Sequence, residues 1–150
     1  MEWFNVFGLF FIAVMLIPNL IYAIVEKGRR KEWRPHPVVA IAEQIGRIGC
    51  LVFMIFQIPG TWFGWWSDEA FAVYLIIDFV LIVFYYAVWI VSFRKNTLFR
   101  ALALSILPAV LFLFSGILCR SIPLIVSAVI FAPSHIYISC QNVKSDRADT

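Results

Sequence analysis

Charged residues are scarce in this chain of 150 residues, where Asp, Glu, Lys and Arg together make up 14% of the sequence. Soluble domains average about 25% charged and about 45–50% apolar residues. Here 63% of the residues are hydrophobic, 17% are aromatic, and the mean hydropathy is +0.90. This composition excludes an ordinary soluble domain. It predicts an all-α integral membrane bundle whose first partner is the lipid bilayer.

Metal ligands and redox-active thiols are also few. The three cysteines, Cys50, Cys119 and Cys140, form no C-x-x-C motif, and of the two histidines only His135 lies in an apolar stretch. The zinc-protease pattern H-E-x-x-H does not occur. Zinc sites take three or four protein ligands. We therefore predict no metal site and no other cofactor.

The sequence lacks the motifs of several enzyme and binding classes. It has no G-x-x-x-x-G-K-[ST] phosphate-binding loop. Ser134 and His135 are adjacent, so on a helix they point about 100° apart and make a poor catalytic pair. The basic residues lie between apolar stretches rather than in a patch with stacking aromatic side chains, which argues against a nucleic-acid partner. An enzyme is therefore the least supported class, and we assign no catalytic residue.

Five apolar segments are long enough to cross a bilayer, which takes about 20 residues of α-helix. They form one domain over residues 1–150, with spans at about 3–25, 38–58, 70–93, 98–119 and 121–140. The N-terminus has no basic region and no small-residue cleavage site, so we expect a retained first helix rather than a signal peptide. Only Arg120 and a turn with Pro123 divide the last two spans, which predicts a tight helical hairpin.

Lysine and arginine are distributed unevenly between the two ends of these spans. One end of the spans has a single basic residue, Arg120, and Arg47 lies inside a span. By the positive-inside rule, the N-terminus is outside and the C-terminus is in the cytoplasm. The basic residues assigned to the cytoplasmic side are Lys27, Arg29, Arg30, Lys31, Arg34, Arg94, Lys95, Arg100, Lys144 and Arg147.

The second loop, residues 59–69, contains Trp62, Trp65 and Trp66. Tryptophan is enriched where a membrane meets water. We expect this loop to lie in the outer head-group region, and a lid over a substrate site is the alternative interpretation.

Three spans contain a proline, at Pro18, Pro108 and Pro133. Each proline leaves the carbonyl one turn earlier without its helical donor and tends to bend the helix. A fixed bend that aids packing is the favoured interpretation, with a hinge as the alternative.

The second span carries the most costly residues in the chain. On a helix, a single stripe is formed by Glu43, Arg47, Cys50, Met54 and Gln57. A charged side chain at the centre of a span costs about 2.5–3.5 kcal/mol, so the stripe is expected to face the bundle interior. Glu43 and Arg47 are spaced i, i+4 and are predicted to form an ion pair.

Two further contacts follow from the depth of residues in their spans. The second and third spans are joined by a short loop and are expected to be antiparallel neighbours. Arg47 lies about 16 Å and Asp78 about 12 Å from the outer end, so a contact between them is expected. Asn19 and His135 lie at about the depth of Glu43, some 8–9 Å from the inner end, and are expected to meet it.

Glu43, Arg47, Asp78, Asn19 and His135 are therefore the candidates for ligand binding or ion coupling. Ionisable residues inside a membrane are often functional, although polar pairs can also serve only to hold helices together. The preferred hypothesis is a small-solute or ion-coupled transporter, or a subunit of one. Five spans are few for a carrier, so a homodimer or a larger membrane complex is expected. The alternative is an accessory, immunity-like or assembly protein whose polar core is structural.

Three stretches give the chain a resemblance to known proteins: EQIGRIGC at 43–50, IPGTWFGWW at 58–66 and LFSG at 113–116. With these it resembles a group of small polytopic bacterial membrane proteins to which no activity is assigned. The resemblance covers most of the chain. It implies a location in the bacterial cytoplasmic membrane, and it carries over no site residue.

Overall fold

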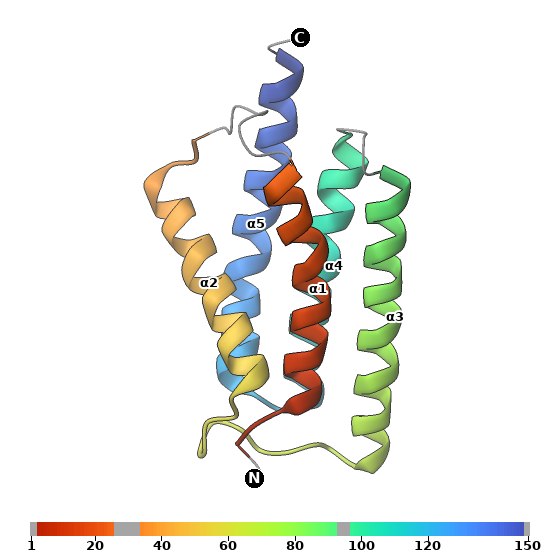
Figure 1. The fold of residues 1–150 in the computed structure, drawn as a ribbon. Helices are drawn as coiled ribbons and strands as arrows, with labels where there is room; N and C mark the ends of the chain where they lie inside the picture. The colour runs from red at the N-terminus through yellow and green to blue at the C-terminus, as the bar shows by residue number, and fades with distance from the viewer. Residues whose placement is uncertain (1–2, 26–33, 93–96, 149–150) are drawn as a thin grey trace.

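The computed structural model describes residues 3–25, 34–92 and 97–148, with side chains described as far as residue 145. These residues form five α-helices, each long and apolar enough to span a membrane. The helices are α1 Val6–Val25, α2 Pro37–Ile55, α3 Asp68–Ser92, α4 Leu98–Leu118 and α5 Ile122–Ala148 (Figure 1). The prediction of an all-α, multi-pass membrane protein is confirmed. Helix α5 is the main difference in length, because it continues past residue 140 into the tail.

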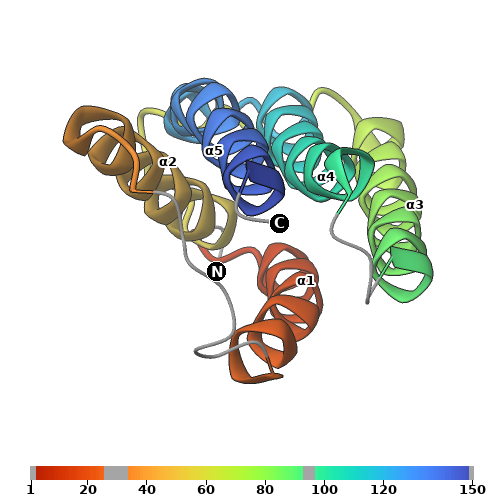
Figure 2. The same cartoon turned by 90° about the horizontal axis from the view of Figure 1, so that it is seen from above.

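Seen along the bundle, α2, α5, α4 and α3 form an arc in that order, with α1 on its concave side (Figure 2). Helix α5 packs against both α2 and α4, and α1 packs against α2 and α3. Helices α2 and α3, both fully described, do not contact each other. The expectation that they are neighbours is therefore wrong. The long segment 56–67 carries the chain from α2 past the α4–α5 hairpin before α3 begins.

The two ends of the bundle are distinct. We call the end that holds the start of α1 and segment 56–67 the N-terminal end, and the opposite end, where α5 finishes, the C-terminal end (Figure 1). Which end faces the cytoplasm depends on the basic loops. Lys27, Arg29, Arg30, Lys31, Arg94 and Lys95 lie outside the described residues, as does the side chain of Arg147. The orientation therefore stays a prediction.

Asn5 fixes the start of α1 and joins it to α3. Its side-chain Oδ1 accepts a hydrogen bond from the Gly8 N–H at 3.0 Å, as N-cap residues do. Its side-chain Nδ2 donates to the Tyr74 hydroxyl on α3 at 3.2 Å. The Asn5 backbone N–H also donates to the carbonyl of Ile55, the last residue of α2, at 2.8 Å. One polar residue thus joins three helices at the N-terminal end.

Helix α4 ends in a Schellman motif, which produces the predicted hairpin with α5. The Ser121 N–H donates to the Gly116 carbonyl at 2.9 Å, and the Arg120 N–H donates to the Ile117 carbonyl at 3.2 Å. Arg120 has a φ of 51°, in the left-handed region where glycine is usual. The turn therefore keeps an arginine at a position that costs backbone strain.

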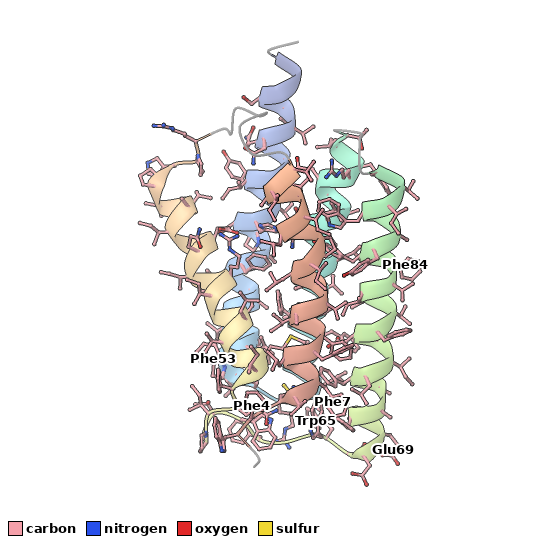
Figure 3. All side chains as sticks on the ribbon, viewed as in Figure 1. Phe4, Phe7, Phe53, Trp65, Glu69 and Phe84 are labelled. Atoms are coloured by element: carbon pink, nitrogen blue, oxygen red, sulfur yellow. The ribbon has the colours of Figure 1, made fainter. Side chains whose placement is uncertain are left out.

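The tryptophan-rich segment 56–67 lies across the N-terminal end and contacts this hairpin turn. The Trp66 indole N–H donates to the Ile117 carbonyl at 3.0 Å. The Arg120 guanidinium carbon lies 4.7 Å from the centre of the Trp66 ring system. Trp65 and Phe7 each pack edge to face against Phe71, and Phe4 lies at the same end, so aromatic side chains form a layer there (Figure 3). Such a layer is typical of a membrane interface.

Candidate functional site

The intramembrane polar residues fall into separate groups rather than one core. Glu43, Arg47 and His135 form the first, which we call the carboxylate–histidine cluster. Asp78 forms a second group with a residue of α4, and Asn19 a third with a residue of α3. The five predicted site residues are thus divided among three places in the bundle.

The carboxylate–histidine cluster joins α2 to α5. The Glu43 Oε1 atom lies 3.1 Å from the His135 Nδ1 atom, and Glu43 Oε2 lies 3.1 Å from Arg47 Nη2. Both predicted contacts of Glu43 with these residues are confirmed. The Glu43 side chain is only 8% exposed, whereas that of His135 is 28% exposed and that of Arg47 is 42% exposed. The carboxylate is therefore buried, and its two partners reach the surface of the described chain.

A close approach of α2 to α5 makes the cluster possible. A Cβ atom at Gly46 would lie 2.6 Å from the backbone N and 2.8 Å from the Cα of Phe131, so only glycine fits between the two helices. The Phe131 ring stacks on the His135 imidazole, with ring centres 4.6 Å apart and an angle of 21° between planes. This stacking orients His135 toward Glu43. The stripe predicted on α2 continues toward the N-terminal end of the bundle, where Cys50 and Met54 are buried.

The arrangement suits a change in proton occupancy. The Arg47 guanidinium compensates the charge of the Glu43 carboxylate. A neutral His135 then leaves the cluster uncharged, and a protonated His135 gives it a charge of +1. A proton arriving at His135 would therefore be held one hydrogen bond from a buried carboxylate.

Asp78 lies on α3 and is fully buried, with 0% exposure. Its Oδ2 atom is 2.8 Å from the Ser115 hydroxyl on α4, and within the described residues its Oδ1 atom has no hydrogen-bond partner. The expected contact with Arg47 does not form, because α2 and α3 are not neighbours and Arg47 turns to Glu43. Sequence reasoning missed Ser115, because it lies only four residues from the outer end of its predicted span whereas Asp78 lies eight residues inside its own.

Asn19 does not join Glu43 and His135 as expected. Its side-chain Oδ1 accepts a hydrogen bond from the Tyr85 hydroxyl at 2.8 Å. This contact joins α1 to α3, because α1 lies on the concave side of the arc and packs against α3 there. The depth of a residue in its span does not show which neighbouring helix its side chain faces.

Arg100 is a buried cation that the sequence analysis counted among the basic residues on the cytoplasmic side. It is the third residue of α4 and only 5% exposed. Its guanidinium carbon lies 4.8 Å from the centre of the Tyr22 ring on α1 and 5.0 Å from that of Trp89 on α3. These are cation–π distances. The position of Trp89 one turn inside its span was the available signal that an aromatic partner lay at this level.

Metal binding has little support in the part of the chain that the structure describes. No group of three His, Cys, Asp or Glu side chains gathers there in a way that could hold an ion. Cys50, Cys119 and Cys140 are free thiols, the first two of them buried.

Comparison with protein-family models, with curated proteins and with solved structures finds no match to this chain. The resemblance to small bacterial membrane proteins therefore identifies no family. The roles of individual residues rest on the geometry alone.

Proposed function

We propose that this multi-pass membrane protein is a proton-linked transporter of small solutes or ions, or a subunit of one, with the carboxylate–histidine cluster as its coupling site. One observation carries the proposal: Glu43 Oε1 lies 3.1 Å from the partly exposed imidazole of His135. An ionisable pair inside a membrane is expensive, and such pairs commonly mark proton or ion pathways. His135 would exchange protons, Glu43 would stabilise the charged form, and Arg47 would hold Glu43 in place.

The helix that carries His135 supports this assignment. Pro133 lies inside α5, two residues before His135, and removes a backbone donor there. Helix α5 is continuous through Pro133, so the proline supplies a carbonyl without its helical donor beside the cluster rather than a broken helix. Asp78 and Asn19 remain further candidates, each on a different helix from the cluster. We place the protein in a bacterial cytoplasmic membrane, as a homodimer or within a larger complex, with the C-terminal end facing the cytoplasm.

Proton coupling can be measured in inverted membrane vesicles from cells that overproduce the chain. The vesicles are energised so that an acidic interior quenches an acridine dye, and a panel of alkali cations, amino acids and sugars is then added. A coupled solute releases protons and restores fluorescence. We expect at least one solute to do so with the wild type, and Glu43→Gln and His135→Gln to remove at least nine-tenths of that response.

Gln44→Leu is the matched control, because Gln44 neighbours Glu43 on α2 but lies on the exposed face of the helix. Each variant is compared at equal abundance in the membrane. The transport proposal is wrong if no solute in the panel restores fluorescence, or if Glu43→Gln responds as fully as Gln44→Leu.

A second candidate is an accessory, immunity-like or assembly protein with a purely structural polar core. It is favoured by the fact that both oxygens of Glu43 are bonded within the chain itself. In that case Glu43→Gln lowers the amount of folded protein in the membrane, and the dye response is the same with and without the chain.

A further inference from the structure

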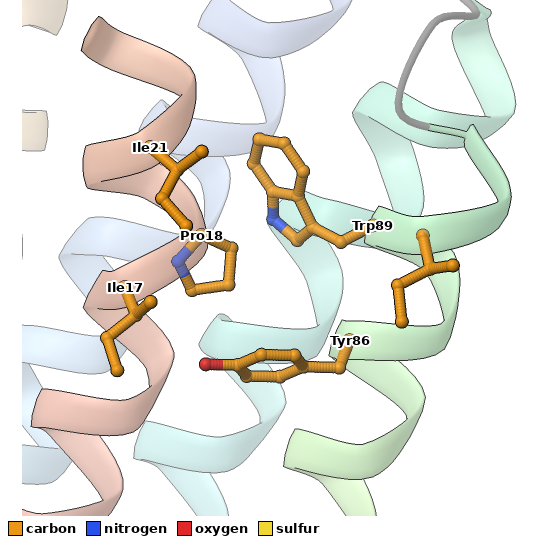
Figure 4. A pocket seen from close by; sticks show the side chains of 6 residues that line it. Ile17, Pro18, Ile21, Tyr86 and Trp89 are labelled. Carbon is orange, nitrogen blue, oxygen red and sulfur yellow. The ribbon is translucent and has the colours of Figure 1, made fainter. Parts of the chain in front are cut away.

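An apolar cavity opens between α1 and α3, away from the carboxylate–histidine cluster. It has a volume of about 350 Å³ and is lined by Ile17, Pro18, Ile21, Tyr86, Trp89 and Ile90 (Figure 4). This volume is at the lower end of the roughly 300–1,000 Å³ usual for ligand sites. It is too small for another helix, whose diameter is about 10–12 Å.

The wall of the cavity is apolar apart from two polar groups, the Trp89 indole N–H and the Tyr86 hydroxyl. The Tyr86 hydroxyl, its one oxygen-bearing side chain, already donates to the Val14 carbonyl at 2.7 Å. Ile17, Ile21 and Ile90 are exposed on the outer surface of the bundle, so the mouth opens sideways. In a membrane-spanning helix such a surface faces lipid. Most of the lining is therefore suited to hydrocarbon, and hydrocarbon surrounds the mouth of the cavity.

The depth of the cavity in the bundle matches the part of an acyl chain that lies nearest to the lipid head group. Ile90 lies two residues before the end of α3, and Ile17 lies eight residues before the end of α1. At about 1.5 Å per residue, the lining extends from about 3 Å to about 12 Å below the C-terminal end of these helices.

A cation lies behind the wall at the same end. The guanidinium carbon of Arg100 is 5.0 Å from the centre of the Trp89 ring, and Trp89 lines the cavity. Arg100 is in the first turn of α4, so it lies near the level where lipid head groups begin. Buried basic side chains between spanning helices are typical of sites for anionic lipid head groups.

We propose that this cavity binds one acyl chain of an anionic phospholipid, with the lipid phosphate at the C-terminal end on the side of Arg100. The apolar wall selects the chain, and the positive charge behind Trp89 selects the head group. This lipid site is independent of the proton-linked function, because it involves other helices and other residues.

Lipid retention measured by native mass spectrometry tests the proposal. The full chain is placed in bilayer discs that contain phosphatidylglycerol and phosphatidylcholine with identical chains in equal amounts, and is then released into the gas phase. We expect one retained phosphatidylglycerol per wild-type chain. Ile21→Phe, which fills the cavity from its mouth, is expected to lower retention at least fivefold. Ile24→Phe is the matched control, because Ile24 is exposed on α1 and does not line the cavity.

The charge of Arg100 is tested in the same experiment. We expect Arg100→Gln to reduce the preference for phosphatidylglycerol over phosphatidylcholine at least threefold, and Arg100→Lys to keep most of it. Equal retention by Ile21→Phe and Ile24→Phe would overturn the acyl-chain site. An unchanged preference in Arg100→Gln would overturn the choice of an anionic lipid. If Arg100→Gln does not fold, the titration of wild-type retention against added salt gives the same test, since screening weakens a charged contact.

Discussion

The hydroxyl of Tyr86 on α3 donates a hydrogen bond of 2.7 Å to the backbone carbonyl of Val14 on α1. Val14 lies four residues before Pro18, which has no N–H to give to that carbonyl. The neighbouring helix thus supplies the donor that the proline removes, which is how prolines are tolerated in membrane-spanning helices. The same contact joins α1 to α3 one turn before the proline.

Removal of this hydroxyl is expected to destabilise the protein. Tyr86→Phe leaves the Val14 carbonyl without a donor inside the membrane, at a cost of about 1–3 kcal/mol. This cost is measured as the difference in the free energy of unfolding between the wild type and Tyr86→Phe in mixed micelles. In a Pro18→Ala background the alanine N–H serves the carbonyl, so Tyr86→Phe should there cost at least about 1 kcal/mol less. Equal costs in both backgrounds would show that the hydroxyl does not act through Val14.

Gly46 is expected to be intolerant of any side chain. Gly46→Ala places a Cβ against the Phe131 backbone, and no rotamer change can relieve this contact. We expect the free energy of unfolding to fall by about 1–3 kcal/mol. Gly49 gives a matched comparison, because a Cβ there would meet the Ser127 side chain. Gly49→Ala should therefore recover in the double variant with Ser127→Gly. A Gly46→Ala protein as stable as the wild type would contradict the close packing of α2 and α5.

Asp78 is expected to carry a proton. The Ser115 hydroxyl lies 2.6 Å from the Leu111 carbonyl and 2.8 Å from Asp78 Oδ2, yet it has one proton to donate. If that proton serves Leu111, the second contact needs a proton on Asp78. We expect Asp78→Asn to change the free energy of unfolding by less than about 1 kcal/mol, and Ser115→Ala to cost about 1–3 kcal/mol.

Infrared difference spectra check the proton on Asp78 directly. The wild type at neutral pH should show a carboxylic-acid C=O band that disappears in Asp78→Asn. Glu43→Gln serves as the control and should leave the band in place, since Glu43 is paired with Arg47. Absence of the band, together with a large destabilisation by Asp78→Asn, would mean that Asp78 is charged.

Arg120 offers a test of stored strain. A left-handed conformation costs a residue other than glycine about 1–2 kcal/mol, while its cation–π contact with Trp66 contributes about 0.5–1 kcal/mol at an exposed site. Arg120→Gly loses the contact but removes the strain, whereas Arg120→Ala only loses the contact. The glycine variant should be more stable than the alanine variant by at least about 1 kcal/mol in equilibrium unfolding. Equal stabilities would argue against strain at this turn.

Much of the local structure could be predicted from the sequence. The length of apolar runs sets the helices, and the helical period places Glu43 and Arg47 one turn apart. Depth matching also brought Glu43 and His135 together correctly, because α2 and α5 are packed neighbours.

The order of helices in the bundle could not be predicted in the same way. Asp78 was matched to Arg47 by depth, but consecutive helices need not be adjacent, and α5 and α4 lie between α2 and α3 in the arc. Arg100 was misplaced for a related reason. In the sequence, a basic residue in the first turn of a helix cannot be distinguished from a basic residue in the preceding loop. Only the structure shows that aromatic side chains of two other helices enclose Arg100.

The orientation of the bundle is the last prediction, and it rests on the uneven distribution of lysine and arginine. Ser67 lies at the N-terminal end and Ser145 near the C-terminal end, so each can be changed to cysteine in a Cys140→Ser background. Cys50 and Cys119 are buried and should not react. We expect a membrane-impermeant maleimide to label Ser67→Cys in intact cells, and Ser145→Cys only after the cells are permeabilised. The opposite pattern would reverse the orientation and place the proposed lipid site in the outer leaflet.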